Sequence, residues 1–459
     1  MERNETIVAI STAMTNSGIG IIRVSGDESI QIVNKVFVPK NKNKTVNKVK
    51  SYTAIYGNVV DEKEIIDECI VLVMKGPHSY TTEDVVELHC HGGVVVMRKV
   101  LNLLVKAGAR PAEPGEFTKR AFLNGRIDLS KAEAVMDMIQ SKNEFALSNS
   151  MRQLNGEYSD KIKNMRKEIL HYIAYIESAL DDPENYSLVD FKDELWTTVS
   201  KIQKDVDYLI QNSDNGRILK EGIKTAIIGK PNAGKSSLLN ILVGEDRAIV
   251  TEIEGTTRDI LEETISINGI PLNIIDTAGI RKTEDIVEKI GIEKAKENIG
   301  IADLILYVVD GSKELDENDY EIMELIENKK TIVLLNKIDL NKKVSKEELN
   351  SKIGKDIVEL SAKNRIGIDE LYEKIKDLFF GGELNFNDEI YITNQRHKAA
   401  FMNASKSLEL VKNSIENEMP EDFYSIDLMN AYEELGYILG ESLEDDLVNE
   451  IFSKFCMGK

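Results

Sequence analysis

The stretch Gly229-Lys-Pro-Asn-Ala-Gly-Lys-Ser236 decides how the middle of this 459-residue chain folds. It fits the phosphate-loop pattern, in which glycines, a lysine and a hydroxyl residue stand at fixed spacing. An apolar run (225–228) precedes it and a helix-like segment (237–242) follows it, which is the context that the pattern requires. The glycines let backbone N–H groups surround phosphate oxygens at a helix N-terminus. The stretch therefore predicts a nucleotide-binding α/β module.

Further segments follow in the order expected of a guanine-nucleotide switch. They are Gly255-Thr-Thr-Arg-Asp259, Asp276-Thr-Ala-Gly279, Asn336-Lys-Ile-Asp339 and Ser361-Ala-Lys363. Asp276 and Asn336 each come at the end of an apolar run, so we expect both at strand tips. The Asp339 carboxylate can accept two hydrogen bonds from the guanine edge, a pairing that adenine cannot supply. Together the segments predict a GTP site.

Each part of this site has an expected role. Lys235 reaches the β- and γ-phosphates, the Ser236 hydroxyl ligates Mg²⁺, and Gly279 offers an N–H to the γ-phosphate. The complete set of expected GTP-binding residues is Asn232, Ala233, Gly234, Lys235, Ser236, Ser237, Thr251, Glu252, Ile253, Glu254, Gly255, Thr256, Thr257, Asp276, Thr277, Ala278, Gly279, Asn336, Lys337, Asp339, Ser361, Ala362 and Lys363.

Composition limits the function classes. The net charge of −21, from 58 basic and 79 acidic residues, argues against nonspecific binding of a phosphate backbone, so nucleic acid would need a local patch or a partner protein. The three cysteines, Cys69, Cys90 and Cys456, form no disulfide framework and suit a reducing cytosol. No stretch is apolar enough to span a membrane, and no signal peptide is evident. We expect a soluble, cytoplasmic protein.

The chain divides into four consecutive parts with different sequence patterns. Residues 1–118 mix short β-like runs with turns, which predicts an α+β domain. Residues 119–216 have apolar residues three or four apart, which predicts helices, and we expect this helical segment to end at Asn215-Gly216. The switch module, with a mostly parallel sheet, occupies 217–382, and 383–459 is helical again. Two helical parts around one module predict that the module is inserted into a single helical domain. Two independent helical domains are the alternative.

The residue that drives GTP hydrolysis is not evident from the pattern. Ras-type enzymes carry a water-orienting Gln directly after Asp-x-x-Gly, but this chain has Ile280 there. Hydrolysis must therefore use another side chain, an ion or a partner. Glu288 is one of three nearby acids, with Glu284 and Asp285, that spacing cannot separate. Arg281 is a candidate for charge stabilisation, as is Arg258, although either could equally form a loop salt bridge.

These segments, with the terminal Cys456-Met-Gly-Lys459, resemble the MnmE/TrmE family of tRNA-modification GTPases. The similarity covers the whole chain, including 18–26 and 124–129. It implies a homodimer formed through the N-terminal domain, with switch modules that pair across the dimer and activation by K⁺. By matching position, Thr257 joins Ser236 on Mg²⁺, and Glu288 takes part in positioning the water. The K⁺ ligands that the resemblance implies are Asn232, Thr251, Ile253 and Thr256. From the residues alone, Asn232 could instead shape its loop by side-chain hydrogen bonding.

The resemblance also implies a folate site in the N-terminal domain. A one-carbon tetrahydrofolate, in the 5-formyl or 5,10-methylene form, would contact Arg23, Glu87, Arg126 and Lys459. Read alone, Arg23 and Glu87 could be ordinary surface charges at strand ends. The spacing of His89-Cys-His91 suggests a zinc site, but no second pair of ligands follows at the usual spacing. The resemblance places Cys456 facing the folate, and its role as nucleophile, proton donor or mere terminus stays open.

The resemblance finally implies a reaction. The protein would be a K⁺-stimulated GTPase that forms a heterotetramer with an FAD-containing MnmG (GidA)-type flavoprotein. Together they would modify C5 of the wobble uridine of certain tRNAs to a carboxymethylaminomethyl type, with the folate supplying the carbon. A ribosome-assembly GTPase that binds rRNA is the alternative. It predicts a basic appendage after 382, whereas 383–459 carries 16 acidic and 6 basic residues. A folate-responsive regulator without a modifying role is a third possibility.

Overall fold

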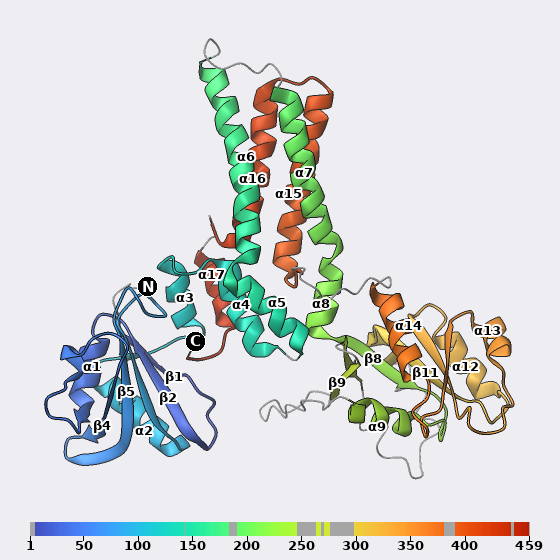
Figure 1. The fold of residues 1–459 in the computed structure, drawn as a ribbon, viewed down its shortest axis with the longest axis horizontal. Coiled ribbons are helices and arrows are strands. Elements are labelled where there is room, and N and C mark those ends of the chain that lie inside the picture. The colour runs from blue at the N-terminus through green and yellow to red at the C-terminus, as the bar shows by residue number, and fades with distance from the viewer. Residues whose placement is uncertain are drawn as a thin grey trace. The chain divides into compact units, whose positions relative to one another are not determined.

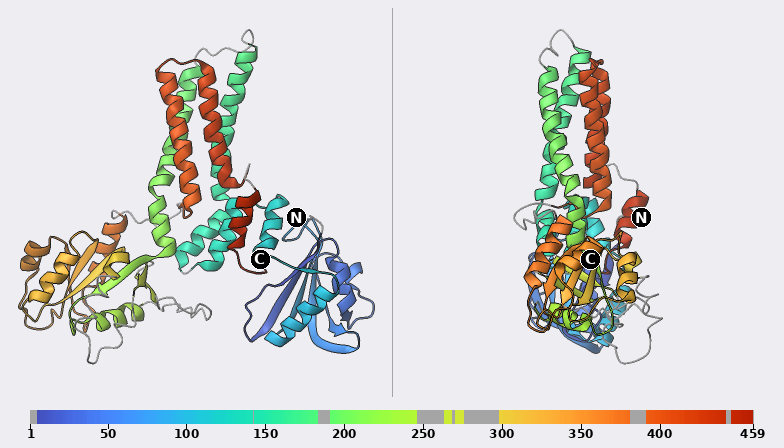
Figure 2. Two further views of the ribbon diagram at one scale, coloured as in Figure 1. Left: turned by 180° about the vertical axis from the view of Figure 1, so that it is seen from behind. Right: turned by 90° about the vertical axis from the view of Figure 1, so that its right-hand side faces the viewer.

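The computed structural model describes residues 5–141, 143–182, 191–245, 263–267, 270–275, 298–380, 391–441 and 445–458. The chain divides into two compact units, and both are assembled from separate stretches of sequence. The first unit combines residues 1–139, 152–195 and 410–459, and the second combines 140–151 and 196–409. Figures 1 and 2 show the elements of each unit.

A seven-stranded sheet organises the first unit, with strand order β3-β4-β5-β6-β2-β1-β7. Its pairs are antiparallel except for β1 with β7. The strands are β1 (Ile7–Ile10), β2 (Ser17–Ser25), β3 (Phe37–Pro39), β4 (Thr53–Asp61), β5 (Glu64–Met74), β6 (Val85–Gly92) and β7 (Arg110–Pro111). Buried and exposed residues alternate along β5, so this strand presents one apolar face. Helices α1 (Ser29–Val36) and α2 (Val94–Lys106) cover that face and complete the core.

The C-terminal end of the chain packs onto this unit. Helix α17 (Asp445–Ser453) buries Phe452 against α3 (Glu116–Leu123) and α4 (Leu129–Gln140). Beyond it the backbone N–H of Gly115 donates to the Cys456 carbonyl at 3.2 Å. Ser11 Oγ then donates to the Gly458 carbonyl at 2.9 Å, which fixes the tail beside β1. Gly458 has φ +82° and lies so close to the Ile10 carbonyl that a Cβ would collide with it.

A long helix pair completes the first unit. Helix α6 (Glu157–Asp181) packs along α16 (Glu421–Leu439), although more than 200 residues separate them in sequence. The predicted apolar face is buried along most of the helix, at Ile162, Met165, Ile169, Ile173 and Ile176. Leu180, predicted on the same face, is exposed near the end of the helix. Buried Arg166 joins the pair: its Nε donates to the Tyr432 carbonyl at 3.1 Å and its guanidinium lies 4.0 Å from the Tyr432 ring centroid. Gly436 leaves room for this guanidinium.

The helices of the second unit are also joined across the intervening module. Helix α7 (Phe191–Gln211) meets α15 (Gln395–Glu416) where Ser405 Oγ donates to Asp207 Oδ1 at 2.6 Å. Asn149, on α5 (Glu144–Asn155), exchanges two hydrogen bonds with the backbone of Tyr391. Segments on both sides of the nucleotide module therefore contact each other directly.

The prediction that the helical segment ends at Asn215-Gly216 is wrong. Both residues lie inside α8 (Ser213–Glu221), and the helix ends at Gly222, which has φ +89°. A glycine is needed at position 216 for another reason, because a Cβ there would lie 2.5 Å from the Ile392 carbonyl oxygen. The glycine permits a close backbone approach rather than a helix end.

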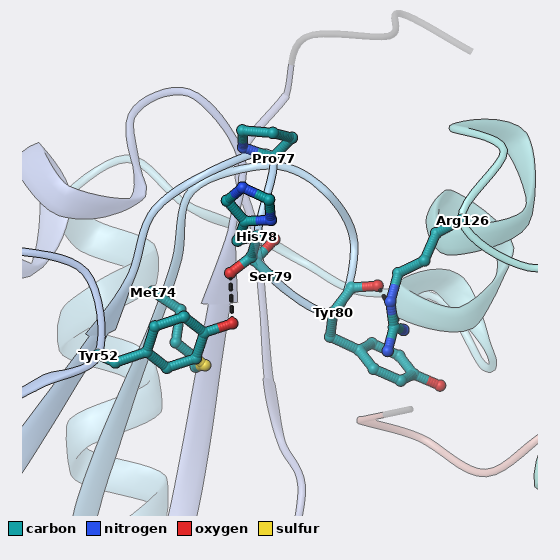
Figure 3. A pocket seen from close by; sticks show the side chains of 7 residues that line it. All are labelled: Tyr52, Met74, Pro77, His78, Ser79, Tyr80 and Arg126. Atoms are coloured by element: carbon teal, nitrogen blue, oxygen red, sulfur yellow. Dashed lines mark hydrogen bonds between the residues drawn. The ribbon is translucent and has the colours of Figure 1, made fainter.

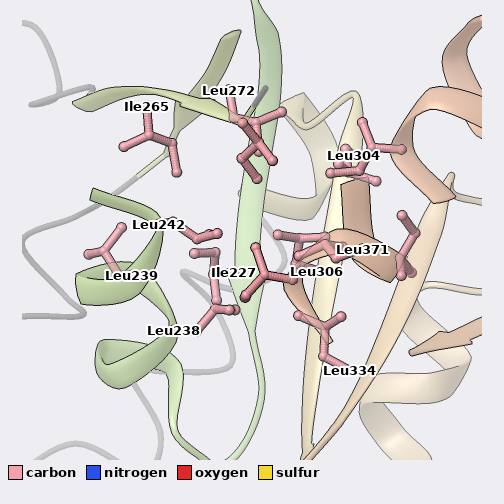
Figure 4. Packing of buried hydrophobic residues seen from close by; sticks show 14 of the residues in the cluster. Ile227, Leu238, Leu239, Leu242, Ile265, Leu272, Leu304, Leu306, Leu334 and Leu371 are labelled. Carbon is pink, nitrogen blue, oxygen red and sulfur yellow. The ribbon is translucent and has the colours of Figure 1, made fainter. Parts of the chain in front are cut away.

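A six-stranded sheet forms the centre of the second unit, in the order β13-β12-β11-β8-β10-β9. Among the described strands of this sheet, only the β10–β9 pair is antiparallel. The strands are β8 (Ile223–Ile228), β9 (Glu263–Ile267), β10 (Ile270–Ile274), β11 (Leu304–Asp310), β12 (Thr331–Asn336) and β13 (Asp356–Leu360), and the helices are α9 (Lys235–Glu245), α12 (Glu317–Leu325), α13 (Lys346–Ile353) and α14 (Ile368–Phe380). Strands β11 and β12 are buried throughout, because apolar clusters form on both sheet faces. Figure 4 shows one cluster, in which Leu238 and Leu371 from two helices meet strand residues. The predicted fold class is thereby confirmed.

Replacing Gly216 by Ala tests the close approach of α8 to the segment at Ile392. We expect a loss of roughly 1–3 kcal/mol in unfolding free energy, because the new Cβ forces the backbones apart. Gly300→Ala is the matched control, since a Cβ at that exposed helical glycine meets nothing within 4 Å. Calorimetry should therefore show a lower Tm for Gly216→Ala alone. Equal Tm values for the two variants would contradict the close approach of α8 to the backbone at Ile392.

Candidate nucleotide-binding site

The phosphate loop connects β8 to α9 at the carboxyl edge of the parallel strands. Gly229 and Gly234 have φ values of +144° and +107°, a region that glycine adopts freely. A Cβ on Gly229 would strike the Val308 carbonyl, and one on Gly234 would strike the Asn336 amide. The two glycines are therefore required by the close packing of the loop against β11 and the end of β12.

Lys235 ends this loop as the first residue of α9. Its Nζ donates to the carbonyls of Gly229 at 2.6 Å and Lys230 at 2.7 Å. Burial lowers the pKa of the Lys235 ammonium to about 8, because removal from water disfavours the charged form. Phosphate oxygens would replace these carbonyls and favour the charged form again. Ser236 and Ser237 follow in the first turn of α9.

The loop after β12 is tied directly to the phosphate loop. Buried Asn336 donates from Nδ2 to the Ala233 carbonyl at 2.8 Å and accepts from the Ala362 N–H at 3.0 Å. Lys337, at φ +65°, donates from Nζ to the Asn232 carbonyl at 2.8 Å. Three of the sequence segments singled out above thus meet in one hydrogen-bonded network.

Asp339 stands exposed at the end of this network, where a base would arrive. Ser361 Oγ donates to Asp339 Oδ1 at 2.7 Å and so orients the carboxylate. Each carboxylate oxygen has two lone pairs, so capacity remains for both guanine donors. Lys363, two residues beyond Ser361, is also exposed.

Sequence reasoning missed two supports of the phosphate loop. Asp310 Oδ2 accepts from Lys337 Nζ at 2.7 Å; burial opposes its ionisation, but the bonds from Lys337 and Ser312 outweigh burial and lower its pKa. Asp310 ends an apolar strand as Asn336 does, so the signal was present. Lys230 pairs with Asp316 at 2.8 Å and with buried Asp319, at the start of α12. No pattern pointed to this second support.

Other expected site residues lie outside the described residues. These are Thr251, Glu252, Ile253, Glu254, Gly255, Thr256, Thr257, Asp276, Thr277, Ala278, Gly279, Arg281, Glu288 and Lys459.

Three of the expected folate residues, Arg23, Glu87 and Arg126, lie close to one tyrosine, Tyr80, and Figure 3 shows Arg126 beside its ring. Arg23 Nε donates to Glu87 Oε1 at 2.8 Å, across the β2–β6 pair. The guanidinium carbons of Arg23 and Arg126 lie 5.3 and 4.8 Å from the centroid of the Tyr80 ring. Arg23 Nη1 also donates to the Gly458 carbonyl at 3.5 Å, so the chain tail that carries Cys456 reaches this group.

The histidines next to this group are engaged with acids. His91 Nδ1 lies 2.6 Å from Asp67 Oδ1, and this contact raises the pKa of His91. His89 Nε2 lies 3.3 Å from Glu87 Oε2. Among the described residues, no cluster of three or more His, Cys, Asp or Glu side chains could hold a metal ion.

A phosphate loop fused to an Asn-Lys-x-Asp loop at the carboxyl edge of a parallel sheet defines a P-loop protein of the GTPase class. Two family models match the chain: the MnmE helical domain over residues 129–456 and the GTP-binding protein TrmE N-terminus over residues 6–126. The chain belongs to the MnmE/TrmE family.

Individual relatives agree over their full length. A protein of Lachnoclostridium phytofermentans named tRNA modification GTPase MnmE is 56% identical over 457 residues, covering all of both chains. One of Thermoanaerobacter pseudethanolicus with the same name is 50% identical, covering 99% of each chain. The solved G domain of the T. maritima FeoB iron transporter is 30% identical over 34% of this chain and 98% of its own. Its TM-score of 0.27 is too low to support an argument about fold.

None of the helices in the described part of the chain has the length and apolarity that a membrane crossing demands.

Replacing Asp339 by Asn tests the base contact. We expect affinity for GTP to fall roughly 10- to 100-fold, because an amide cannot accept both guanine donors. Affinity for XTP should rise, because the new amide can donate to the xanthine oxygen. Competition with a fluorescent nucleotide measures both affinities. Asp369→Asn, an exposed acid on α14, should leave them unchanged. A retained preference of Asp339→Asn for GTP over ATP would refute the contact.

Proposed function

We propose that this protein hydrolyses GTP and uses the cycle to modify tRNA. The observation that carries the proposal is the network through Asn336, which joins the phosphate loop to the loop bearing Asp339. Membership of the MnmE/TrmE family supports the tRNA part, since the relatives at 50–56% identity are named tRNA modification GTPases.

The domain boundaries form part of this proposal. Residues 1–118 would form the dimerising folate domain, 119–216 and 383–459 one helical domain, and 217–382 the inserted switch module. One helical-domain model that extends over 129–456 supports this arrangement. The α6–α16 and α7–α15 pairs support it too, because each joins helices from opposite sides of the module.

The described residues fit the two expected cations. Ser236 follows Lys235 in the first turn of α9, and its hydroxyl oxygen suits Mg²⁺. Asn232 is exposed at φ +62°, and its backbone carbonyl is already held by Lys337, which leaves the hard amide oxygen of its side chain for K⁺. When bound, the cations would neutralise charge on the transferring phosphoryl group. Thr257 would complete the Mg²⁺ site, and Thr251, Ile253 and Thr256 the K⁺ site, with Arg281 and Glu288 acting in hydrolysis.

We expect GTP hydrolysis in K⁺ to exceed hydrolysis in Na⁺ by at least about tenfold at equal ionic strength, because the larger ion suits a site of neutral oxygens. Asn232→Ala should remove the difference between the salts. Asn240→Ala, an exposed asparagine on α9, should keep it. Phosphate release gives the rates, and equal wild-type rates in the two salts would reject the K⁺ assignment.

The N-terminal residues fit a folate. Glu87 can accept from the amino-pyrimidine edge of a pterin, and Arg23 and Arg126 can pair with carboxylates. The folate would supply the one-carbon unit, and Lys459 would complete its site. Cys456 is exposed on the docked tail beside this group.

We include a homodimer in the proposal. An FAD-containing MnmG-type partner would supply the redox step and most of the tRNA-binding surface, and the complex would act in the cytoplasm.

Mass spectrometry of tRNA wobble nucleosides tests the modification. Cells that lack the protein should lose the carboxymethylaminomethyl-type uridine, and the wild-type gene should restore it. Asp339→Asn should fail to restore it, because this variant cannot cycle on GTP. Cys456→Ser separates the two activities if hydrolysis persists while modification is lost. Normal wobble uridines in the deletion strain would exclude a modifying role.

A further inference from the structure

Asp319 carries a buried carboxylate in the first turn of α12. Its Oδ1 accepts from the hydroxyl of Tyr307 at 2.9 Å, and its Oδ2 accepts from the Asp316 N–H at 3.1 Å. Tyr307 is itself fully buried on β11, where it pairs with Ile228, the last residue of β8 before the phosphate loop. The carboxylate is therefore fixed to the strand that lies beside the entry to the phosphate loop.

The side chain of Lys230 is bound at this carboxylate. Its Nζ pairs with Asp319 Oδ2, and with Asp316 Oδ2 at 2.8 Å, while only 16% of the side chain is exposed. Burial opposes the charged form of Lys230, but the hydrogen bonds to both carboxylates outweigh burial and raise its pKa. Removing one partner of such a buried pair is strongly unfavourable, because the other charge is left uncompensated. Lys230 is therefore held firmly at the start of α12.

The backbone of the same residue belongs to the phosphate loop. The Lys230 carbonyl accepts from Lys235 Nζ at 2.7 Å and from the Ala233 N–H at 3.3 Å. Because this carbonyl and the anchored side chain belong to one residue, the contact with α12 restricts the backbone of the loop. The same contact restricts the place where Lys235 rests.

The other flank of the phosphate loop is held in a similar way. Lys337 Nζ donates to the Asn232 carbonyl at 2.8 Å and to Asp310 Oδ2 at 2.7 Å. Asp310 and Asp319 both belong to the stretch 310–319, which leads from the end of β11 into α12. Two lysine–aspartate pairs thus fix two points of the phosphate loop to one stretch of chain.

We propose that Lys230 and Asp319 form a positioning pair, which holds the phosphate loop in the shape that binds the β-phosphate of GTP and acts through the loop backbone. The inference rests on the proposed function, which supplies the GTP. Backbone N–H groups of such a loop bind a phosphate well only when they point at it together. The pair restricts the loop to that arrangement, so its loss weakens binding of substrate and transition state alike. Such a loss raises KM and leaves kcat nearly unchanged.

Replacing Lys230 by Met tests the pair, because methionine keeps an unbranched side chain and removes the charge. We expect the Kd values for GDP and GTP, and the KM for GTP, to rise roughly 10- to 100-fold. The kcat should stay within about threefold of the wild-type value. Lys230→Arg should restore the wild-type Kd to within about threefold, because a guanidinium can pair with both carboxylates. Fluorescent nucleotides measure the Kd values, and phosphate release measures the rates.

Asp319→Asn provides a second, independent variant. It should raise the same Kd values, and the double variant Lys230→Met/Asp319→Asn should be no more than about threefold weaker than Lys230→Met alone, because both changes break one interaction. Lys374→Met is the matched control. Lys374 pairs with Asp356 at 2.8 Å on the surface of the same module, so this variant should keep the wild-type Kd, KM and kcat.

The outcomes separate this inference from the function on which it rests. Unchanged Kd values in Lys230→Met and Asp319→Asn would overturn the positioning pair and leave GTP binding intact. A lower kcat at an unchanged KM would also overturn it, because partial unfolding removes active protein without altering the affinity of the rest. Losses that multiply in the double variant would show two separate roles and reject the pair. A wild-type protein that does not bind GTP would instead remove the proposed function.

Discussion

The buried amide of Asn336 is the contact on which the nucleotide site depends. It holds the phosphate loop through the Ala233 carbonyl and the base loop through the Ala362 N–H, so one side chain fixes the spacing of two ligand-binding elements. Because the amide lies directly over Gly234, that position excludes a side chain. Lys337 reinforces the arrangement by bonding to the phosphate loop and to Asp310. The spacing between the phosphate loop and the loop that carries Asp339 is thus set by contacts within the protein.

A second constraint acts at the opposite end of the sequence. The Gly458 carbonyl accepts from Ser11 and Arg23, which lie more than 430 residues earlier. The tail passes too close to β1 for any residue with a Cβ at Gly458. The tail that carries Cys456 therefore ends against the N-terminal sheet, and its distance from that sheet in sequence conceals this.

Sequence patterns predicted those features that depend on local chemistry. Asn336 ends β12, as the apolar run before it predicts. The hydrogen bond between Ser361 and Asp339 was not predicted, although both residues were expected at the nucleotide. The ion pairs of Lys230 with α12, and the Tyr80 ring between two guanidiniums, depend on tertiary approach and leave no periodic signal. Gly216 shows the opposite failure: a helix-ending residue type instead served a close contact with Ile392. Expected site residues outside the described part of the chain, such as Thr257, stay predictions.

The pairing of α6 with α16 has a consequence for biosynthesis. About 240 residues of chain separate the end of α6 from the start of α16. At translation rates of roughly 5–20 residues per second, the apolar stripe of α6 waits on the order of 10–50 s for the helix that covers it. The switch module, which contains its own core, emerges during that interval. The apolar face of α6 must therefore be protected from aggregation until synthesis of the chain is nearly finished.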